Sequence, residues 1–162
     1  LAYKGEVDLS PLLPKPEAGK RSPFSWPAVF ISPDGKHVYA SLWSYGPANG
    51  IGIFSRDAAT GALKFLEKSS VPGMKGGAVC WEEGGKLGYF GNWVNPVTWF
   101  TRDAESGKLT VAGTVKETQS KIPRNLLYDR ENGLLYVGTS MSEHIKEFHL
   151  YVFRTGAAAA AK

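Results

Sequence analysis

An all-β fold made of repeated four-stranded units is predicted by three features of the sequence. Residues 55–63 return as residues 101–109, 46 positions later, with the same Arg-Asp pair and the same turn glycine. The pair Ala28-Val29 returns as Ala78-Val79, 50 positions later. Short apolar runs separated by glycine-containing turns fill each unit, and no long helical periodicity interrupts them. Such a period, with four short strands per unit, is typical of β-propeller blades.

The composition agrees with one globular domain of this class. The chain has 162 residues, of which 43% are hydrophobic, with 19 glycines and 10 prolines for turns. The formal net charge of +4 is modest. The Lys and Arg residues are scattered, whereas a nucleic-acid site requires them to be clustered. We therefore expect a solvated, slightly basic surface and no nucleic-acid partner.

The sequence predicts a soluble protein without a transmembrane segment, because no apolar run approaches the roughly 20 residues of a membrane span. Cys80 is the only cysteine, so no disulfide can form within the chain. Its apolar surroundings predict an unreactive core residue. No cofactor and no metal are expected, since no histidine has ligand spacing to another His, Cys or carboxylate. The cellular compartment is left open.

The repeat pattern divides the chain into segments. Each complete blade is expected to contain an inner strand, a turn, a second strand, a loop, a third strand, a hairpin and an outer strand. The segments are an outer strand of a blade at 1–9, a Pro-rich connection at 10–27, blade one at 28–70, blade two at 71–118, blade three without its outer strand at 119–156, and a tail at 157–162. The predicted fold is a β-propeller segment of about three four-stranded antiparallel blades.

Two stretches resemble a known family. Residues 32–40, which begin Ser-Pro-Asp-Gly-Lys, and residues 53–63, which carry the Arg-Asp pair and the turn glycine, are similar to the blade repeat of the lactonase-type seven-bladed β-propellers. That family includes 6-phosphogluconolactonase-like and carboxymuconate-cyclase-like proteins. The resemblance covers roughly residues 24–156, although residues 82–85 of blade two depart from the motif. It implies the propeller fold and, as an activity, hydrolysis of a small acidic lactone. The matching motifs lie at turns and strand ends, so they report fold and not chemistry.

Ligand-binding candidates are predicted where the inner strands begin, because the residues before them converge at the mouth of the central channel. Trp26 and Arg124 are the candidates at this mouth. The planar guanidinium of Arg124 suits a carboxylate or phosphate group of a lactone substrate. The alternative for Arg124 is a surface or inter-blade salt bridge. Trp26 would stack on a ligand or cap the core.

Candidates for acid–base chemistry are weaker. Glu143 and His144 lie together in the loop of blade three and are the one cluster with that potential. His37 follows a turn lysine and is expected to be solvated. No Ser-His-Asp order, nucleophile elbow or phosphate loop is visible, so the catalytic residues are unknown.

Three blades cannot close a ring, because propellers typically need about four to eight. We therefore expect other protein chains or a second copy to cover the open blade faces. Ile53 and Val152 are predicted to lie on those faces. The main interpretation is a non-catalytic binding or scaffold subunit in a larger assembly. The alternative is a lactone hydrolase of which this chain is a part, and its partner would be a small acidic lactone.

Overall fold

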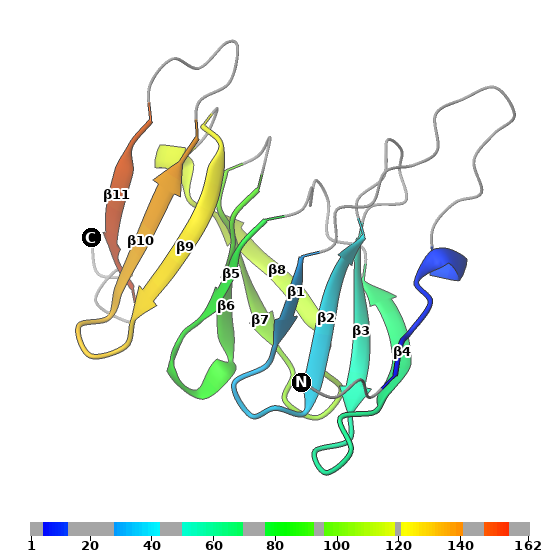
Figure 1. Cartoon of the computed structure of the whole chain (residues 1–162). Coiled ribbons are helices and arrows are strands. Elements are labelled where there is room, and N and C mark those ends of the chain that lie inside the picture. The colour runs from blue at the N-terminus through cyan, green and yellow to red at the C-terminus, as the bar shows by residue number, and fades with distance from the viewer. Residues whose placement is uncertain are drawn as a thin grey trace, which may run out of the picture.

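The computed structural model describes residues 5–12, 28–42, 50–69, 77–92, 96–118, 121–140 and 148–155. In this part of the chain, eleven strands form three antiparallel sheets that stand side by side (Figure 1). The prediction of an all-β propeller segment is confirmed. The helices described are single-turn 3-10 helices, and none of them has the length or the apolar run needed to cross a membrane.

Each sheet follows the chain in simple order, as expected for a propeller blade. The first sheet contains β1 (Val29–Ile31), β2 (His37–Leu42), β3 (Gly50–Arg56) and β4 (Leu63–Ser69). The second contains β5 (Val79–Trp81), β6 (Leu87–Phe90), β7 (Thr98–Arg102) and β8 (Leu109–Thr114). The third contains β9 (Pro123–Asp129), β10 (Leu134–Thr139) and β11 (Leu150–Arg154). The 3-10 helices are η1 (Ser10–Leu12), η2 (Glu83–Gly85) and η3 (Lys116–Thr118).

The repeated hairpin between the third and fourth strands is held by an aspartate. Oδ1 of Asp57 accepts hydrogen bonds from the backbone N–H of Thr60 at 2.7 Å and from its hydroxyl at 2.8 Å. Asp103 makes the same two bonds to Ser106, both at 2.7 Å. These short side-chain bonds are the reason that aspartate favours turns. A glycine with a φ of +79° (Gly61) or +75° (the equivalent residue 107) then closes the turn.

Two apolar cores lie between the sheets. The first is formed by the facing sides of the first and second sheets, and its buried members are Tyr39, Ile51, Ile53, Trp81, Phe90, Phe100 and Leu109. The second lies between the second and third sheets, and its buried members are Tyr89, Val97, Leu135 and Val137. Because each blade presents one face to each neighbour, both faces of its strands are apolar, unlike those of a sheet with one solvated side.

Two predictions about exposure were wrong. Ile53 is 0% exposed and belongs to the first core, so it does not lie on an open face. Strand alternation places Ile53 on the same face as Tyr39, its partner across the β2–β3 ladder, and this face packs on the second sheet. His37 is 3% exposed, not solvated, because it points between the same two sheets. Val152 is 54% exposed on the third sheet, as expected.

The N-terminal segment lies over the outer face of the first sheet, where Val7 and Leu9 approach Val29 and Phe54. Residues 5–9 are not part of a strand in the structure. The prediction of an outer strand at 1–9 therefore stays a prediction, as do the blade boundaries. Most of the Pro-rich connection and the whole tail at 157–162 lie outside the described residues.

Candidate functional site

The candidate site is the end of the sheets at which the inner strands begin. β1, β5 and β9 run in the same direction, and all three start at this end (Figure 1). The hairpins that follow these strands lie at the opposite end. The four-stranded blades of propellers surround a central channel, and the convergence of the first residues of these strands at its mouth stays a prediction.

Arg124 is the predicted site residue that the structure describes, and it occupies a special place in β9. In the β9–β10 ladder, Asn125 pairs with Gly138 and Pro123 pairs with Thr139, so Arg124 is the extra residue of a β-bulge. Bulges of this kind redirect a side chain and are frequent beside functional sites. Arg124 is half-buried and makes interactions within the protein. The inter-blade contact foreseen as an alternative to ligand binding therefore stays open.

The neighbourhood of Arg124 is tightly packed. A Cβ atom added to Gly91, just after β6, would lie 2.7 Å from the backbone oxygen of Pro123. Only glycine permits this close approach of two strand ends. Asn92 follows at 0% exposure, and Thr118 accepts a hydrogen bond from the backbone N–H of Val97 at 2.8 Å. The start of β9 is thus fixed against the second sheet, which favours a defined position for the arginine.

Trp26, Glu143 and His144 lie outside the described residues, so stacking by Trp26 and acid–base chemistry by the other two stay predictions. Within the described ranges, no three His, Cys, Asp or Glu side chains are grouped so that they could hold a metal ion.

A second polar cluster joins the first two sheets at their hairpin end. Nη2 of Arg102 donates to Oδ1 and Oδ2 of Asp34 at 3.0 and 2.8 Å. The same nitrogen lies 2.9 Å from Nδ1 of His37, and Nε of Arg102 donates to the Tyr39 hydroxyl at 3.0 Å. That hydroxyl donates to the backbone oxygen of Gly107 at 2.9 Å. One arginine of the second sheet therefore binds three side chains of the first sheet and its turn.

The charges of this cluster are mutually stabilised. Burial alone would raise the pKa of Asp34, but hydrogen bonds from Ser32 and Arg102 hold it well below its ordinary value. Burial and the adjacent guanidinium lower the pKa of His37, which keeps the imidazole neutral so that Nδ1 can accept from Arg102. Burial raises the pKa of Tyr39, which therefore stays protonated.

We interpret this cluster as a structural clasp and not as an active site. The side chain of Arg102 is 1% exposed, and His37 and Tyr39 are 3% and 0% exposed, so a substrate cannot reach these three groups. The cluster also lies at the opposite end from the channel mouth. Sequence reasoning missed it, although Asp34 and Arg102 stand inside the two repeated motifs, because the motifs were interpreted separately as turns.

A different polar pair lies within the second sheet, beside the core that this sheet forms with the third. The Tyr89 hydroxyl donates to Oε1 of Glu82 at 2.5 Å, and burial followed by this carboxylate raises the pKa of Tyr89. Cys80 is half-buried in the same region, where burial and then Glu82 raise its pKa to about 12. A thiol that holds its proton so firmly is a poor nucleophile, which fits the expectation of an unreactive cysteine.

Stability is expected to fall as the pH falls from about 7.5 to about 5, because His37 is neutral in the folded protein. The unfolded chain binds a proton on this residue near pH 6.5, whereas the folded-state pKa is lower. The unfolded state therefore binds more protons. The stabilisation that neutral His37 provides is complete above the unfolded-state pKa and is lost as the pH falls below it. Asp34, whose pKa is also depressed, adds a further loss below its ordinary value of 3.8.

Urea unfolding at the two pH values measures this change in the free energy of unfolding. The matched control is His37→Leu, since Leu87 occupies the equivalent position 50 residues later. This variant should lose most of the change in free energy of unfolding between the two pH values. If the His37→Leu variant shows the same change with pH as the unaltered protein, another titrating group is responsible.

This architecture matches a known family and several solved structures. A family model described as a lactonase with a seven-bladed β-propeller matches residues 8–116. A protein from Lactobacillus plantarum has a TM-score of 0.60 and 20% identity, with coverage of 82% of this chain and 38% of that chain. A proposed 6-phosphogluconolactonase from Bacteroides fragilis has a TM-score of 0.55 and 20% identity, with coverage of 83% and 41%. The periplasmic gluconolactonase of Pseudomonas aeruginosa has a TM-score of 0.50 and 19% identity, with coverage of 82% and 41%.

These identities are low, so the structural matches show the fold alone. The chain spans about 40% of the length of these solved structures. No curated protein matches the chain by sequence.

Proposed function

The chain belongs to the lactonase family of seven-bladed β-propellers, and from this premise we propose that it supplies part of a lactone-hydrolysing propeller. The substrate class is a sugar-acid lactone that carries a negative group. In the reaction, water adds to the carbonyl carbon, the ring C–O bond breaks, and the leaving oxygen takes a proton to give the hydroxy acid. The match over residues 8–116 is the observation that carries this proposal.

Arg124 is proposed to bind the anionic group of the substrate. A guanidinium stays protonated at neutral pH, so it can hold a phosphate or carboxylate but cannot act as the base that activates water. The bulge at the start of β9 and the close contact of Gly91 with Pro123 support this role, because they set Arg124 apart from the regular ladder at the channel mouth.

The scaffold interpretation, which the sequence alone favoured, receives less support. Family membership and structural neighbours described as lactonases favour the hydrolase alternative. We therefore keep the lactone hydrolase as the proposed function.

The Arg124→Ala variant should lower kcat/KM for a phosphorylated sugar lactone by roughly 100-fold, since loss of one partner of a charge pair in a site costs about 3 kcal/mol. The loss should fall mostly on KM, and Arg124→Lys should recover part of it. Acid release at constant pH measures the rate after subtraction of spontaneous hydrolysis.

Arg154→Ala is the matched control, because Arg154 is exposed near the end of β11, at the hairpin edge. It should leave the rate unchanged. Equal activity of the Arg124→Ala variant and the unaltered protein would remove Arg124 from the site. Absence of any rate above the spontaneous reaction would count against lactone hydrolysis itself.

A further inference from the structure

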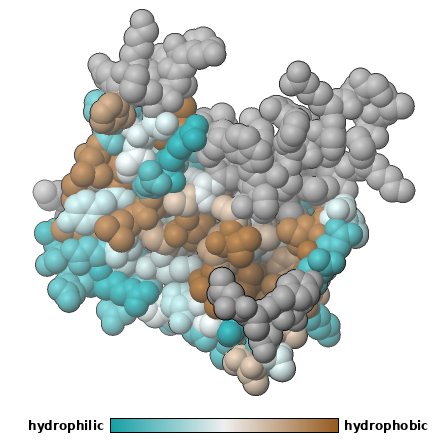
Figure 2. Space-filling view, in the orientation of Figure 1, coloured by the Kyte–Doolittle hydropathy of each residue, from teal (hydrophilic) through white to brown (hydrophobic). Residues whose placement is uncertain are grey.

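The turn between β9 and β10 contains an asparagine that a glycine follows, Asn132 and Gly133. It lies at the hairpin edge of the third sheet, where polar side chains gather (Figure 2). Asn132 is exposed, and Gly133 has a φ of +62°, which glycine adopts readily because it has no Cβ. In such a pair, the backbone nitrogen of the glycine can reach the side-chain carbonyl of the asparagine, since no Cβ on the glycine shields it. The turn therefore holds a reactive pair at the surface.

The reaction open to such a pair is deamidation. The backbone nitrogen of Gly133, after it gives its proton to water, attacks Cγ of Asn132 and forms a five-membered imide. The Cγ–Nδ2 bond breaks, and Nδ2 leaves as ammonia with a proton from the solvent. Water then opens the ring, either at Cγ to give aspartate or at the backbone carbonyl to give isoaspartate. One water is consumed and one ammonia is released, so the reaction needs no oxidant and no cofactor.

The attacking nitrogen of this pair has no hydrogen bond to lose. The turn glycines of the first and second sheets, Gly61 and Gly107, donate their backbone N–H groups to the aspartate four residues earlier, at 2.9 and 3.0 Å. Among the residues that the structure describes, the N–H of Gly133 has no acceptor. The third turn is closed instead by the ladder, in which Leu134 pairs with Asp129. The nitrogen is therefore available for the reaction.

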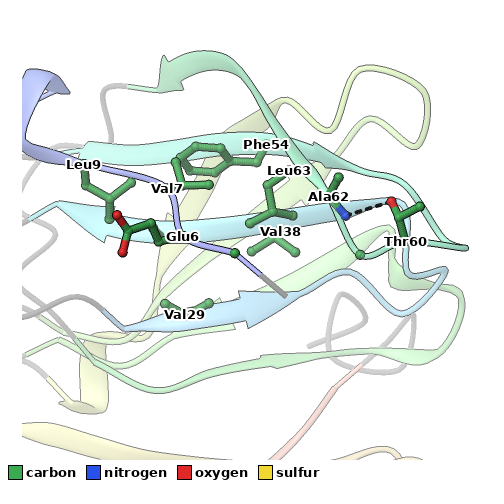
Figure 3. A pocket seen from close by; sticks show the side chains of 12 residues that line it. Glu6, Val7, Leu9, Val29, Val38, Phe54, Thr60, Ala62 and Leu63 are labelled. Carbon is green, nitrogen blue, oxygen red and sulfur yellow. Dashed lines mark hydrogen bonds between the residues drawn. The ribbon is translucent and has the colours of Figure 1, made fainter. Parts of the chain in front are cut away.

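The turn of the first sheet shows an unreactive version of the same arrangement. The residue before its glycine is Thr60, whose Oγ1 accepts from the N–H of Ala62 at 3.2 Å (Figure 3). The Thr60 hydroxyl also donates to Asp57 at 2.8 Å, and a threonine has no amide group that can be attacked. In the third turn, Nδ2 of Asn132 donates to Oδ2 of Asp129 at 2.7 Å. The contact that a hydroxyl makes in the first turn is thus made here by a group that can be lost.

The surroundings of the pair leave room for the reaction. The Asn132 amide is exposed, so water replaces its bond to the carboxylate at small cost when the amide turns toward the glycine. Thr155 holds the glycine from the other side, because its N–H and its hydroxyl donate to the oxygen of Gly133 at 2.9 and 3.2 Å. A Cβ added to Gly133 would have no neighbour closer than 3.9 Å. Nothing therefore packs over the reacting atoms.

A second pair of similar chemistry is protected by the fold. Asp34 precedes Gly35, and an Asp-Gly pair can form the same imide with loss of water. The N–H of Gly35, however, donates to the oxygen of Ser32 at 2.8 Å. The carboxylate of Asp34 is bound by Arg102 at 2.8 and 3.0 Å. Both reacting groups are thus engaged, so the structure separates two pairs that look alike in the sequence.

We propose that Asn132 deamidates spontaneously in the folded protein, with water as the co-reactant, and that the product weakens the β9–β10 hairpin. The aspartate or isoaspartate has lost the Nδ2 donor to Asp129 and places a second carboxylate beside it. Hydrogen bonds from Asn132 and then from the backbone of Glu131 lower the pKa of Asp129, so its carboxylate is ionised at neutral pH. Two like charges then meet where a hydrogen bond stood. Isoaspartate also adds a carbon to the backbone of the turn.

Peptide mapping of the full chain tests the site. The protein is kept folded at neutral pH, and samples taken at intervals are digested with trypsin and weighed by mass spectrometry. Trypsin cuts after Arg130 and Lys146, and Asn132 is the asparagine of the resulting peptide 131–146. This peptide should gain about 1 Da and separate into an aspartate and an isoaspartate form.

Two other peptides of the same digest serve as controls. Peptide 125–130 contains an asparagine that precedes a leucine, and its mass should change at least about tenfold more slowly. Peptide 22–36 contains the Asp-Gly pair at residues 34 and 35 and should stay a single species. If peptide 131–146 keeps its mass in the folded protein but gains mass in urea, the fold protects Asn132 and the proposal fails. A peptide 131–146 that is unchanged in both states would also overturn it.

Two variants test the effect on the hairpin. Asn132→Asp, which has the charge of the product, should lower the urea midpoint of unfolding. Asn132→Ser is the matched control, because Ser106 donates to Asp103 at 2.7 Å in the turn of similar sequence in the second sheet. A serine should therefore keep the contact with Asp129, retain the midpoint and abolish the mass gain. An Asn132→Asp variant as stable as the unaltered protein would contradict the weakening of the hairpin. The lactone assay is independent of these results.

Discussion

Replacement of Arg102 by alanine is expected to lower the free energy of unfolding by about 3 to 4 kcal/mol, as for other buried ion pairs that lose one partner. The variant loses two hydrogen bonds to Asp34, one to Tyr39 and the contact with His37. The side chain of Asp34 is 32% exposed, so water recovers part of this loss for the carboxylate. The hydroxyl and imidazole are buried and recover little.

Urea unfolding at neutral pH measures this effect, and Arg56→Ala is the matched control. Arg56 has the equivalent position in the first sheet but does not cross to another described sheet, so its replacement should cost well under 1 kcal/mol. Arg102→Lys should restore only part of the stability, because an ammonium cannot bind Asp34 and Tyr39 at once in the geometry of a guanidinium. If Arg56→Ala and Arg102→Ala lower the free energy of unfolding equally, Arg102 does not stabilise the contact between the first two sheets as we describe.

Replacement of Gly107 by alanine is expected to cost about 3 kcal/mol, from two sources. Its φ of +75° is unfavourable for any residue with a Cβ, which costs about 1 kcal/mol. The new Cβ would also lie 2.5 Å from Cδ2 of His37, a buried ring held by Arg102. Relief of this overlap must displace the ring or the hairpin, at about 2 kcal/mol.

Gly61→Ala separates the two sources. Gly61 closes the equivalent hairpin of the first sheet with a φ of +79°, and nothing lies within 4 Å of its added Cβ. It should therefore show the backbone cost alone. Thermal or urea unfolding of the two variants gives the difference, which reports the packing of the second hairpin on His37. A difference near zero would show that this hairpin is not seated on the first sheet as the structure describes.

The repeats made the architecture predictable. Residues 55–63 and 101–109 share turn chemistry that is encoded within nine residues, so the hairpins, strand order and sheet number followed from the sequence. Asp57 and Asp103 illustrate why: each bonds to groups two and three residues away, without help from the rest of the chain.

The contacts between blades were not predictable in the same way. Arg102 binds Asp34, which is 68 residues away, and His37, which is 65 residues away. Strand alternation divides residues into two faces but does not say which face meets which neighbour when both are apolar. Ile53 was therefore placed on the wrong face, and His37 was predicted to be solvated because its local surroundings are polar.

The candidate site was only partly predictable for a different reason. The position of Arg124 in the repeat predicted that it precedes an inner strand. In the structure that strand is β9, which begins at Pro123. The bulge that makes it irregular depends on a shift in pairing with β10 between Gly138 and Thr139, and no local motif signals it. The two ends of the sheets thus have different tasks. The hairpin end holds the first two sheets together through Arg102, and the mouth is the ligand site that we propose.

The most direct test of this account is to map where a phosphorylated sugar acid, the product of the proposed reaction, binds to the protein. Backbone amide NMR shifts recorded during a titration report each strand separately. The account predicts shifts at the beginnings of β5 and β9, including Arg124, and none at the clasp around Arg102. Shifts confined to the hairpin end, or saturable binding that Arg124→Ala leaves unchanged, would contradict it.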